Sequence, residues 1–131
     1  MQLPQDAMLL RIFFGERDRY QGRPLHDVIV RKARELHLAG ATVLRGPLGF
    51  GQSAKLHQAH LLSMTQDLPV IIEIVDAEDK IDAFLPVLDE MMESGLVTLE
   101  KAKVLQYGRQ RAGLLERIKQ QFGHHHHREA S

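Results

Sequence analysis

The sequence predicts an α+β sandwich of the ferredoxin-like βαββαβ type, with a four-stranded antiparallel sheet and two helices on one face. Apolar, strand-like runs alternate with amphipathic segments in the order β-α-β, long loop, β-α-β. The two halves also share a junction between helix and strand, "LAGATVL" in the first and "ESGLVTL" in the second. Two such halves form this sandwich.

The first half starts with "AMLLRIFFG" at residues 7–15, which predicts a buried strand closed by glycine. Pro24 suits the first turn of a helix, and Gly40 is expected to end that helix. "ATVLR" at residues 41–45 predicts the second strand. The helix between them carries one apolar stripe, formed by Leu25, Val28, Ile29, Ala33 and Leu36.

The second half starts with "LPVIIEIVD" at residues 68–76, the clearest strand of the chain. Asp76 is expected to cap the next helix, which Pro86 should bend or break and Gly95 should end. "LVTL" and "KVLQY" then supply a last strand, with an interruption near Glu100 left open. The apolar stripe of this helix is Ile81, Phe84, Leu85, Leu88 and Met91.

The strands are more apolar than one layer of helices can cover. In "MLLRIFF" and "VIIEIV" only Arg11 and Glu73 interrupt the apolar run, whereas a sheet with one wet face should alternate. Each Ile, Leu or Phe left in water forfeits roughly 1.5–3 kcal/mol. Either a C-terminal helix or other copies of the chain must therefore cover the second face, and we favour a symmetric oligomer.

Length and composition predict one soluble domain with an additional C-terminal segment. The chain has 131 residues, no cysteine, and 17 basic against 17 acidic residues, so no overall charge attracts nucleic acid or anionic membrane. No run approaches the ~20 apolar residues of a membrane span, and no signal peptide is evident, so we expect a cytoplasmic protein. We expect the sandwich at residues 1–109, a C-terminal helix at 110–123 and a disordered His-containing tail at 124–131.

The stretch "LRGPLGFGQSAKLH" at residues 44–57 places three glycines and a proline within six residues after a strand. One interpretation is a long hairpin loop whose glycines satisfy turn geometry. The other is an anion or nucleotide loop, in which glycine N–H groups approach phosphate oxygens between Arg45 and Lys55, and Phe50 lies against a base. The pattern is not the GxxxxGK[ST] phosphate loop.

The motifs "LRIFFGE", "AGATVLRG", "GFG" and "LPVIIEIVD" together resemble the PII-like family known as domain of unknown function 190, over roughly residues 8–107. The resemblance implies a homotrimer related to PII signalling proteins, which bind adenine nucleotides between subunits and contact transporters or enzymes through a long loop. It implies nucleotide contacts at Gly49, Phe50 and Gly51, with Gln52 as a further one, and a loop from about 46 to 66. Together with the anion-loop interpretation, the predicted nucleotide contacts are Arg45, Gly46, Gly49, Phe50, Gly51, Gln52 and Lys55.

Two departures from PII proteins favour AMP or ADP over ATP. PII proteins carry a GDGK-type phosphate loop before the last strand, where this chain has "ESGLVTLEK". They also present arginines at the end of that strand, where Arg109 and Arg111 are displaced counterparts. The resemblance therefore implies a regulatory protein without catalytic turnover, acting on an unidentified transporter, channel or enzyme.

Other constellations are weaker. His57 and His60, at i and i+3, could share a metal, and copper-tolerance proteins share this trimeric fold, so a metal-binding trimer is the alternative function. Arg17 or Arg19 could reach a phosphate between subunits, although a solvated loop is the simpler interpretation. No nucleophile has a base at a characteristic spacing, so we expect no enzyme. RNA recognition is disfavoured because "PVIIEIV" lacks aromatic residues.

Overall fold

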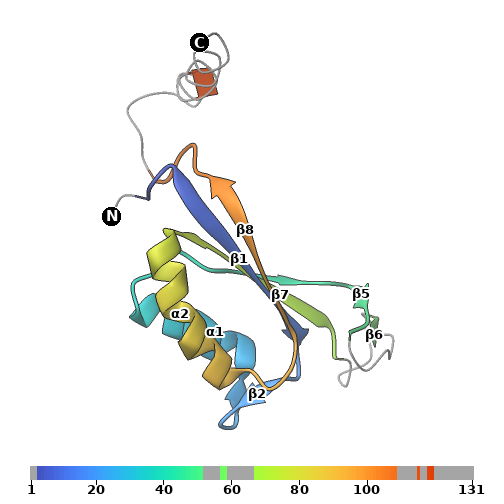
Figure 1. Ribbon diagram of the computed structural model, residues 1–131. Coiled ribbons are helices and arrows are strands. Elements are labelled where there is room, and N and C mark those ends of the chain that lie inside the picture. The colour runs from blue at the N-terminus through green and yellow to red at the C-terminus, as the bar shows by residue number, and fades with distance from the viewer. Residues whose placement is uncertain (1–2, 52–56, 59–66, 109–114, 116–117, 120–131) are drawn as a thin grey trace.

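The computed structural model describes residues 3–51, 57–58, 67–108, 115 and 118–119. Its elements run in the order predicted, with short hairpin strands added (Figure 1). They are β1 (Asp6–Gly15), β2 (Arg19–Tyr20), β3 (Arg23–Pro24), α1 (Leu25–Glu35), β4 (Thr42–Arg45), β5 (Leu48–Gly49), β6 (His57–Gln58), β7 (Pro69–Asp76), α2 (Glu78–Met91) and β8 (Leu96–Lys103). Most of the predicted C-terminal helix and the whole histidine tail lie outside the described residues.

The main sheet has four antiparallel strands in the order β4-β7-β1-β8. β1 lies at the centre, where it pairs with β7 on one side and β8 on the other. Both helices pack on the same face of this sheet (Figure 1). The predicted ferredoxin-like α+β class is therefore confirmed.

The core lies between the helices and one face of the sheet. Alternate residues of β1 and β7 point into it, as the two-residue period of a strand requires. The largest fully buried side chains of the described residues are Phe84, Leu10, Ile12, Ile29, Ile72, Ile74, Ile81, Leu88 and Val70. The two halves of the chain thus share one core.

The helix stripes predicted from the sequence enter this core with one exception. Leu25, Ile29 and Ala33 of α1 are buried, but Leu36 lies beyond the last turn and is 41% exposed. The helix ends earlier than Gly40 would allow, because His37 adopts the left-handed conformation with φ 61°. The prediction that Gly40 ends this helix is therefore wrong.

Three expectations for the second half are also corrected. The N-cap residue of α2 is Ala77, so the prediction that Asp76 caps this helix is wrong. The buried carboxylate of Asp76 instead accepts hydrogen bonds from the N–H groups of Ala39, at 2.8 Å, and Ala77, at 2.7 Å. α2 continues through Pro86 without a break. β8 is one strand through Glu100, so the interruption left open there is absent.

The other face of the sheet is not covered by either helix. It presents side chains of all four strands, and Leu44 and Leu96 on it are 45% and 56% exposed. The excess of apolar residues noted in the strands therefore lies on this face, which we call the open face. Within the part of the chain that the structure describes, no helix has the length and apolar character needed to cross a membrane.

Candidate functional site

The candidate site is the segment from Arg45 to Gly51, which we call the glycine corner. It begins where β4 ends and turns around Pro69, the first residue of the neighbouring strand β7. Figure 1 shows it at one end of the sheet, where it includes β5 and lies beside β6. The N–H of Gly46 donates to the carbonyl oxygen of Pro69 at 2.8 Å, which fixes the start of the corner.

Close packing explains two of the glycines. A Cβ atom at Gly46 would lie 2.8 Å from Cγ of Pro69, and one at Gly49 would lie 2.9 Å from the same atom. Neither glycine has the left-handed backbone conformation that only glycine adopts readily. The backbone therefore lies against the proline ring, where a larger residue would have to displace it.

Gly51 and Phe50 are different, because the described structure leaves both largely exposed. A Cβ atom at Gly51 would meet no atom within 4 Å. The side chain of Phe50 is 70% exposed, an unusual position for an aromatic residue. The corner thus presents an aromatic ring to solvent on a backbone held by Pro69.

Arg45 supplies the positive charge at this corner but is already paired. Its Nε lies 2.7 Å from Oε1 of Glu16, and its side chain is 53% exposed. Such an exposed pair contributes little to stability and can exchange partners. Arg45 can therefore reach an anion at the corner if it gives up or shares Glu16.

The structure brings together Arg45, Gly46, Gly49, Phe50 and Gly51 of the predicted nucleotide contacts. Gln52, Lys55, His60, Arg109 and Arg111 lie outside the described residues. The backbone of His57 pairs with Gly49 in the β5–β6 hairpin. Among the residues that the structure describes, no three histidine or carboxylate side chains gather into a metal site.

An acidic cluster that no sequence motif indicates lies beside the corner and ties β1 to β7. The N–H of Arg17 donates to Oδ1 of Asp67 at 2.7 Å, and the N–H of Gly15 to Oδ2 of Asp18 at 3.4 Å. Burial raises the pKa of the Asp18 carboxyl; the hydrogen bond from Gly15 opposes this, while the charges of Asp67 and Glu93 add to it. Arg17 and Asp67 are 50 residues apart in the chain, so no local pattern could reveal this cluster.

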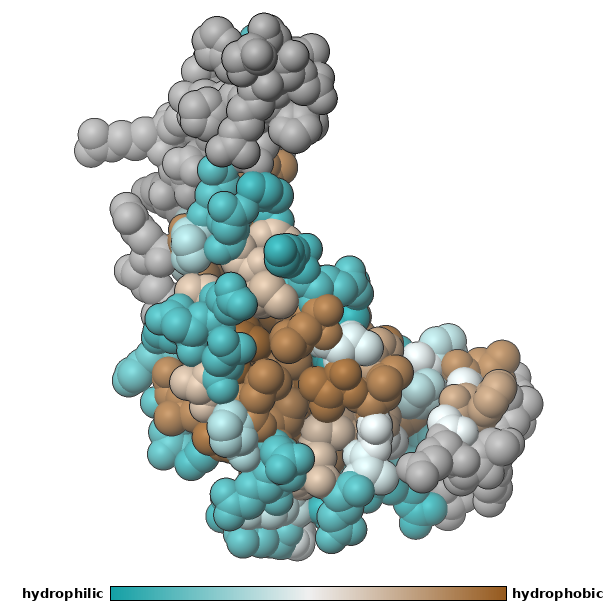
Figure 2. Space-filling model, viewed as in Figure 1, coloured by the Kyte–Doolittle hydropathy of each residue, from teal (hydrophilic) through white to brown (hydrophobic). Residues whose placement is uncertain are grey.

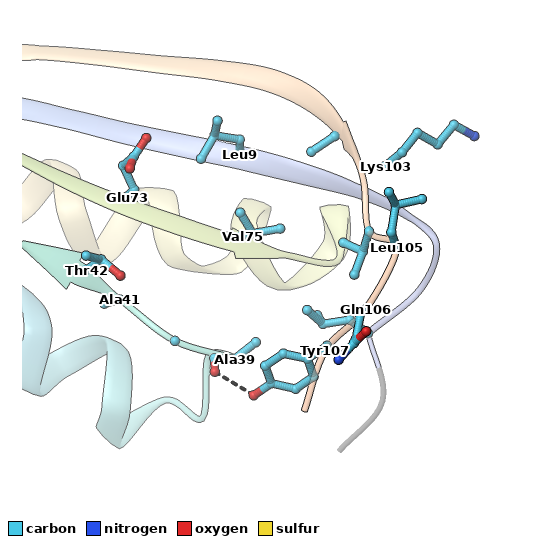
Figure 3. A pocket seen from close by; sticks show the side chains of 14 residues that line it. Leu9, Ala39, Ala41, Thr42, Glu73, Val75, Lys103, Leu105, Gln106 and Tyr107 are labelled. Carbon is cyan, nitrogen blue, oxygen red and sulfur yellow. Dashed lines mark hydrogen bonds between the residues drawn. The ribbon is translucent and has the colours of Figure 1, made fainter. Parts of the chain in front are cut away.

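The opposite end of the sheet holds a hollow of about 700 Å³, which we call the Tyr107 hollow (Figure 3). The hydroxyl of Tyr107 donates to the carbonyl oxygen of Ala39 at 2.7 Å and closes one side. Its walls are mainly apolar, with a few polar groups; they include Leu9, Val75, Leu105, Thr42, Glu73 and Gln106.

A second hollow, of about 390 Å³, lies between α2 and the start of β8, with Leu85, Met92 and Val97 among its walls. Neither this hollow nor the Tyr107 hollow is lined by the glycine corner. Among the residues that the structure describes, the corner thus lines neither hollow, and a ligand enclosed there would need further walls.

Comparison with known proteins agrees with this fold. Residues 7–104 match the family DUF190, described as Uncharacterized ACR. A UPF0166 protein of Aquifex aeolicus is 37% identical over 97 residues, which cover 74% of this chain and 91% of that protein. A UPF0166 protein of Methanocaldococcus jannaschii is 31% identical over 99 residues, which cover 75% of this chain and 91% of that protein.

Two solved structures have the same fold. One is CPII, a nitrogen regulatory PII-like protein from Thiomonas intermedia bound to ADP, AMP and bicarbonate, with TM-score 0.52 and 16% identity over 76% of this chain and 88% of CPII. The other is a putative PII-like signaling protein from Thermus thermophilus, with a TM-score of 0.55 and 16% identity. The match covers 76% of this chain and 89% of that protein.

The family match covers all four strands of the main sheet and both helices. The resemblance on which the site residues were predicted is thus confirmed, and the likeness to CPII extends it to the fold. This chain belongs to the DUF190 family and has a PII-like fold.

Proposed function

We propose that this chain is a cytoplasmic PII-like regulatory protein that binds AMP or ADP without turning it over. The nucleotide binds at the glycine corner, in the clefts between copies of a homotrimer. Binding changes the loop formed by residues from about 46 to 66, which signals to a transporter, channel or enzyme.

The observation that carries the proposal is the construction of the glycine corner. Pro69 holds the backbone in place, Phe50 carries a largely exposed aromatic ring, and Arg45, with its guanidinium, stands at the start of the same segment. An aromatic ring and a cation on a preformed backbone are what a nucleotide requires for its base and phosphate. Gly51, for which packing gives no reason, allows a ligand to approach the backbone closely.

The comparisons support an adenine nucleotide. CPII, whose fold this chain shares, was solved with ADP and AMP. At 16% identity that likeness identifies the fold and not the ligand, so the transfer depends on the glycine corner.

The connection between α2 and β8 supports AMP or ADP over ATP. It begins after Met91 and carries Glu93, Ser94 and Gly95, with no lysine or arginine. It also lies at the same end of the sheet as the glycine corner, because Leu96 pairs with Phe13 and Pro69 with Gly15. A third phosphate at this connection would therefore meet the carboxylate of Glu93, and residues 92–95 supply no cation for it.

Isothermal titration with AMP, ADP and ATP tests this proposal. We expect AMP or ADP to bind more tightly than ATP. Phe50→Ala should weaken binding by about 1–3 kcal/mol, the usual contribution of base stacking on an aromatic side chain. Leu48→Ala is the matched control, since Leu48 is also exposed, at 53%, but carries no aromatic face.

The absence of heat with all three nucleotides would contradict the nucleotide proposal. Equal losses in the Phe50 and Leu48 variants would contradict the assignment of Phe50. Glu16 pairs with the guanidinium of Arg45 and so competes with a phosphate for it. If Arg45 binds the phosphate, Arg45→Gln should bind the nucleotide more weakly, and Glu16→Gln should bind it at least as tightly as the unmodified chain.

A further inference from the structure

The edge strand β8 carries an apolar surface on the helix face of the sheet. Val97 pairs with Ile12, and Leu99 with Leu10, in the register between β1 and β8. Both β1 partners are fully buried under the helices, so the two β8 side chains point to the same face. Val97 and Leu99 are nevertheless 41% and 42% exposed, so α1 and α2 leave them partly uncovered. Figure 2 shows apolar surface over the middle of the molecule, where β8 runs beside α2.

This surface continues into the second hollow, which has acidic as well as apolar walls. Leu85 and Met92 extend the apolar surface of Val97, and Asp89 and Glu93 add two carboxylates. Neither carboxylate forms an ion pair with a residue that the structure describes. We call this surface the α2–β8 groove; it is formed by Leu85, Asp89, Met92, Glu93, Val97 and Leu99. It therefore combines an apolar floor with two negative charges that lack a partner among the described residues.

The C-terminal segment, residues 109–123, is complementary to this groove in its sequence. It carries four basic residues and one acidic residue, a formal excess of three positive charges at neutral pH. Its apolar residues recur at helical spacing, and the described positions 115, 118 and 119 are helical. These apolar residues are Leu114, Leu115, Ile118 and Phe122. Leu115 is 73% exposed, so the described structure leaves this apolar position largely without packing.

The segment is long enough to reach the groove. β8 runs about 20 Å from Lys103 back to Val97, at about 3.3 Å per residue. Residues 109–113 span up to about 17 Å when extended, and the predicted helix over residues 114–122 adds about 13 Å. The segment also starts at the end of the sheet where β8 ends. A segment tethered in this way acts at a high effective concentration, so even a weak interaction with the groove is populated.

The open face is a poorer match for a basic segment. The strand carboxylates on it, Glu73 and Glu100, both bind Arg11. Nε of Arg11 lies 2.8 Å from Oε2 of Glu73, and its Nη1 lies 2.6 Å from Oε1 of Glu100. A cation that arrives on this face would have to compete with Arg11, whereas one that arrives at the α2–β8 groove breaks no ion pair of the described residues.

We propose that the C-terminal segment packs in the α2–β8 groove of its own chain, as a third helix on the helix face of the sheet. Its apolar residues cover Val97 and Leu99, and its basic residues lie beside Asp89 and Glu93. A helix of this length is marginal in water on its own, and burial of its apolar side stabilises it. This inference goes beyond the proposed function and does not rest on it.

Disulfide trapping tests the inference, because the chain has no cysteine of its own. Full chains with Val97→Cys/Leu115→Cys or Val97→Cys/Ile118→Cys are oxidised with diamide in the absence of nucleotide. We expect at least one pair to form a disulfide within one chain, seen by mass spectrometry, since a bridge requires Cβ atoms about 4 Å apart. Leu44→Cys with the same two partners is the matched control, because Leu44 is 45% exposed but lies on the open face. It should stay reduced.

Removal of one groove acid tests the electrostatic match. In the pair that reacts, Asp89→Asn should slow disulfide formation about two- to fivefold, and high salt should reduce the difference between the variant and its parent. Glu90→Gln is the matched control, because Glu90 is the exposed neighbour of Asp89 and does not line the hollow. It should leave the rate unchanged.

Urea denaturation of Leu115→Ala gives an independent measurement. Alanine is the better helix former, so in a segment that does not pack on the sheet this change should leave the unfolding equilibrium constant unchanged. In the packed segment it should raise that constant about tenfold, because buried apolar surface is lost. The effect should be smaller in a Val97→Thr chain, since the two side chains are in contact.

A disulfide with Leu44→Cys in place of Val97→Cys, a disulfide formed only between chains, or none at all would overturn the inference. Equal rates for Asp89→Asn and Glu90→Gln, or a neutral Leu115→Ala, would overturn it as well. Circular dichroism checks that each variant folds. If Val97→Cys does not fold, Leu99→Cys replaces it in both pairs, because it lies two residues along the same face.

The two proposals can fail separately, because the trapping contains no nucleotide. Trapping as expected, without heat on titration with AMP, ADP or ATP, would refute the nucleotide proposal alone. Heat on titration without trapping would refute this inference alone.

Discussion

Pro69 determines the residue types of the glycine corner. Its ring lies where the side chains of residues 46 and 49 would be, so glycine at both positions follows from packing and not from a turn. Sequence alone assigns those glycines to turn geometry or to a ligand, because a contact between β4 and β7 is invisible in a single segment. Only Gly51 remains without a packing reason.

Gly46→Ala tests this contact. With Cβ placed 2.8 Å from the Pro69 ring, we expect a loss of about 1–3 kcal/mol in the free energy of unfolding, measured by urea denaturation. Gly40→Ala is the matched control, because a Cβ atom there meets nothing within 4 Å, and it should be neutral or slightly stabilising. Equal stability of the two variants would show that the corner yields to a methyl group.

Asp18 gives a second prediction at the scale of one residue. Its folded-state pKa is raised, so its charged carboxylate costs stability at neutral pH. This cost declines as the pH falls through the raised pKa and is gone below the ordinary pKa of an aspartate. Asp18→Asn keeps an oxygen to accept from Gly15 and should stabilise the chain at pH 7, with the gain vanishing towards pH 3. Urea denaturation across this range, with the exposed Asp82→Asn as control, measures it; a gain independent of pH would contradict it.

At the scale of the elements, periodicity in the sequence predicts the helices and strands. The features that it does not predict, such as where a helix ends, depend on contacts between residues far apart in the chain. The apolar stripes of α1 and α2 and the apolar strands are predictable because each pattern lies within one short segment of the sequence. The end of α1 is misplaced because His37, and not a glycine, adopts the left-handed conformation. α2 also stays helical through Pro86, and four of its side chains are buried in the core: Ile81, Phe84, Leu88 and Met91.

The ion pairs of Arg11 with Glu73 and Glu100 show the same difference between what local sequence and what distant contacts decide. Arg11 and Glu73 are recognisable as the only interruptions of two apolar runs, but their pairing depends on the register between β1 and β7. Glu100 is the only carboxylate of β8, but its contact with Arg11 depends on the register between β1 and β8, which places Glu100 opposite Leu9, two residues from Arg11 on the same face. For the candidate site, the segment itself is predictable from its glycines, but Pro69 and Asp67 beside it are not.

At the scale of the whole molecule, a truncation can show what covers the open face: other copies of the chain, or the C-terminal segment. If copies of the chain cover it, deleting residues 109–131 should leave the assembly unchanged in sedimentation velocity. If the C-terminal segment covers it, the deletion should change the oligomeric state or cause aggregation, because the apolar face would be exposed.

The anchoring of Tyr107 to Ala39 has a practical consequence. This hydrogen bond holds the segment after β8 at the end of the sheet where β1 begins. A fluorophore attached after Gly108 would therefore be linked to the end of the sheet opposite to Phe50. Labels placed there on separately prepared batches would report any exchange of subunits by energy transfer, and the end of the sheet that carries the glycine corner would remain unmodified.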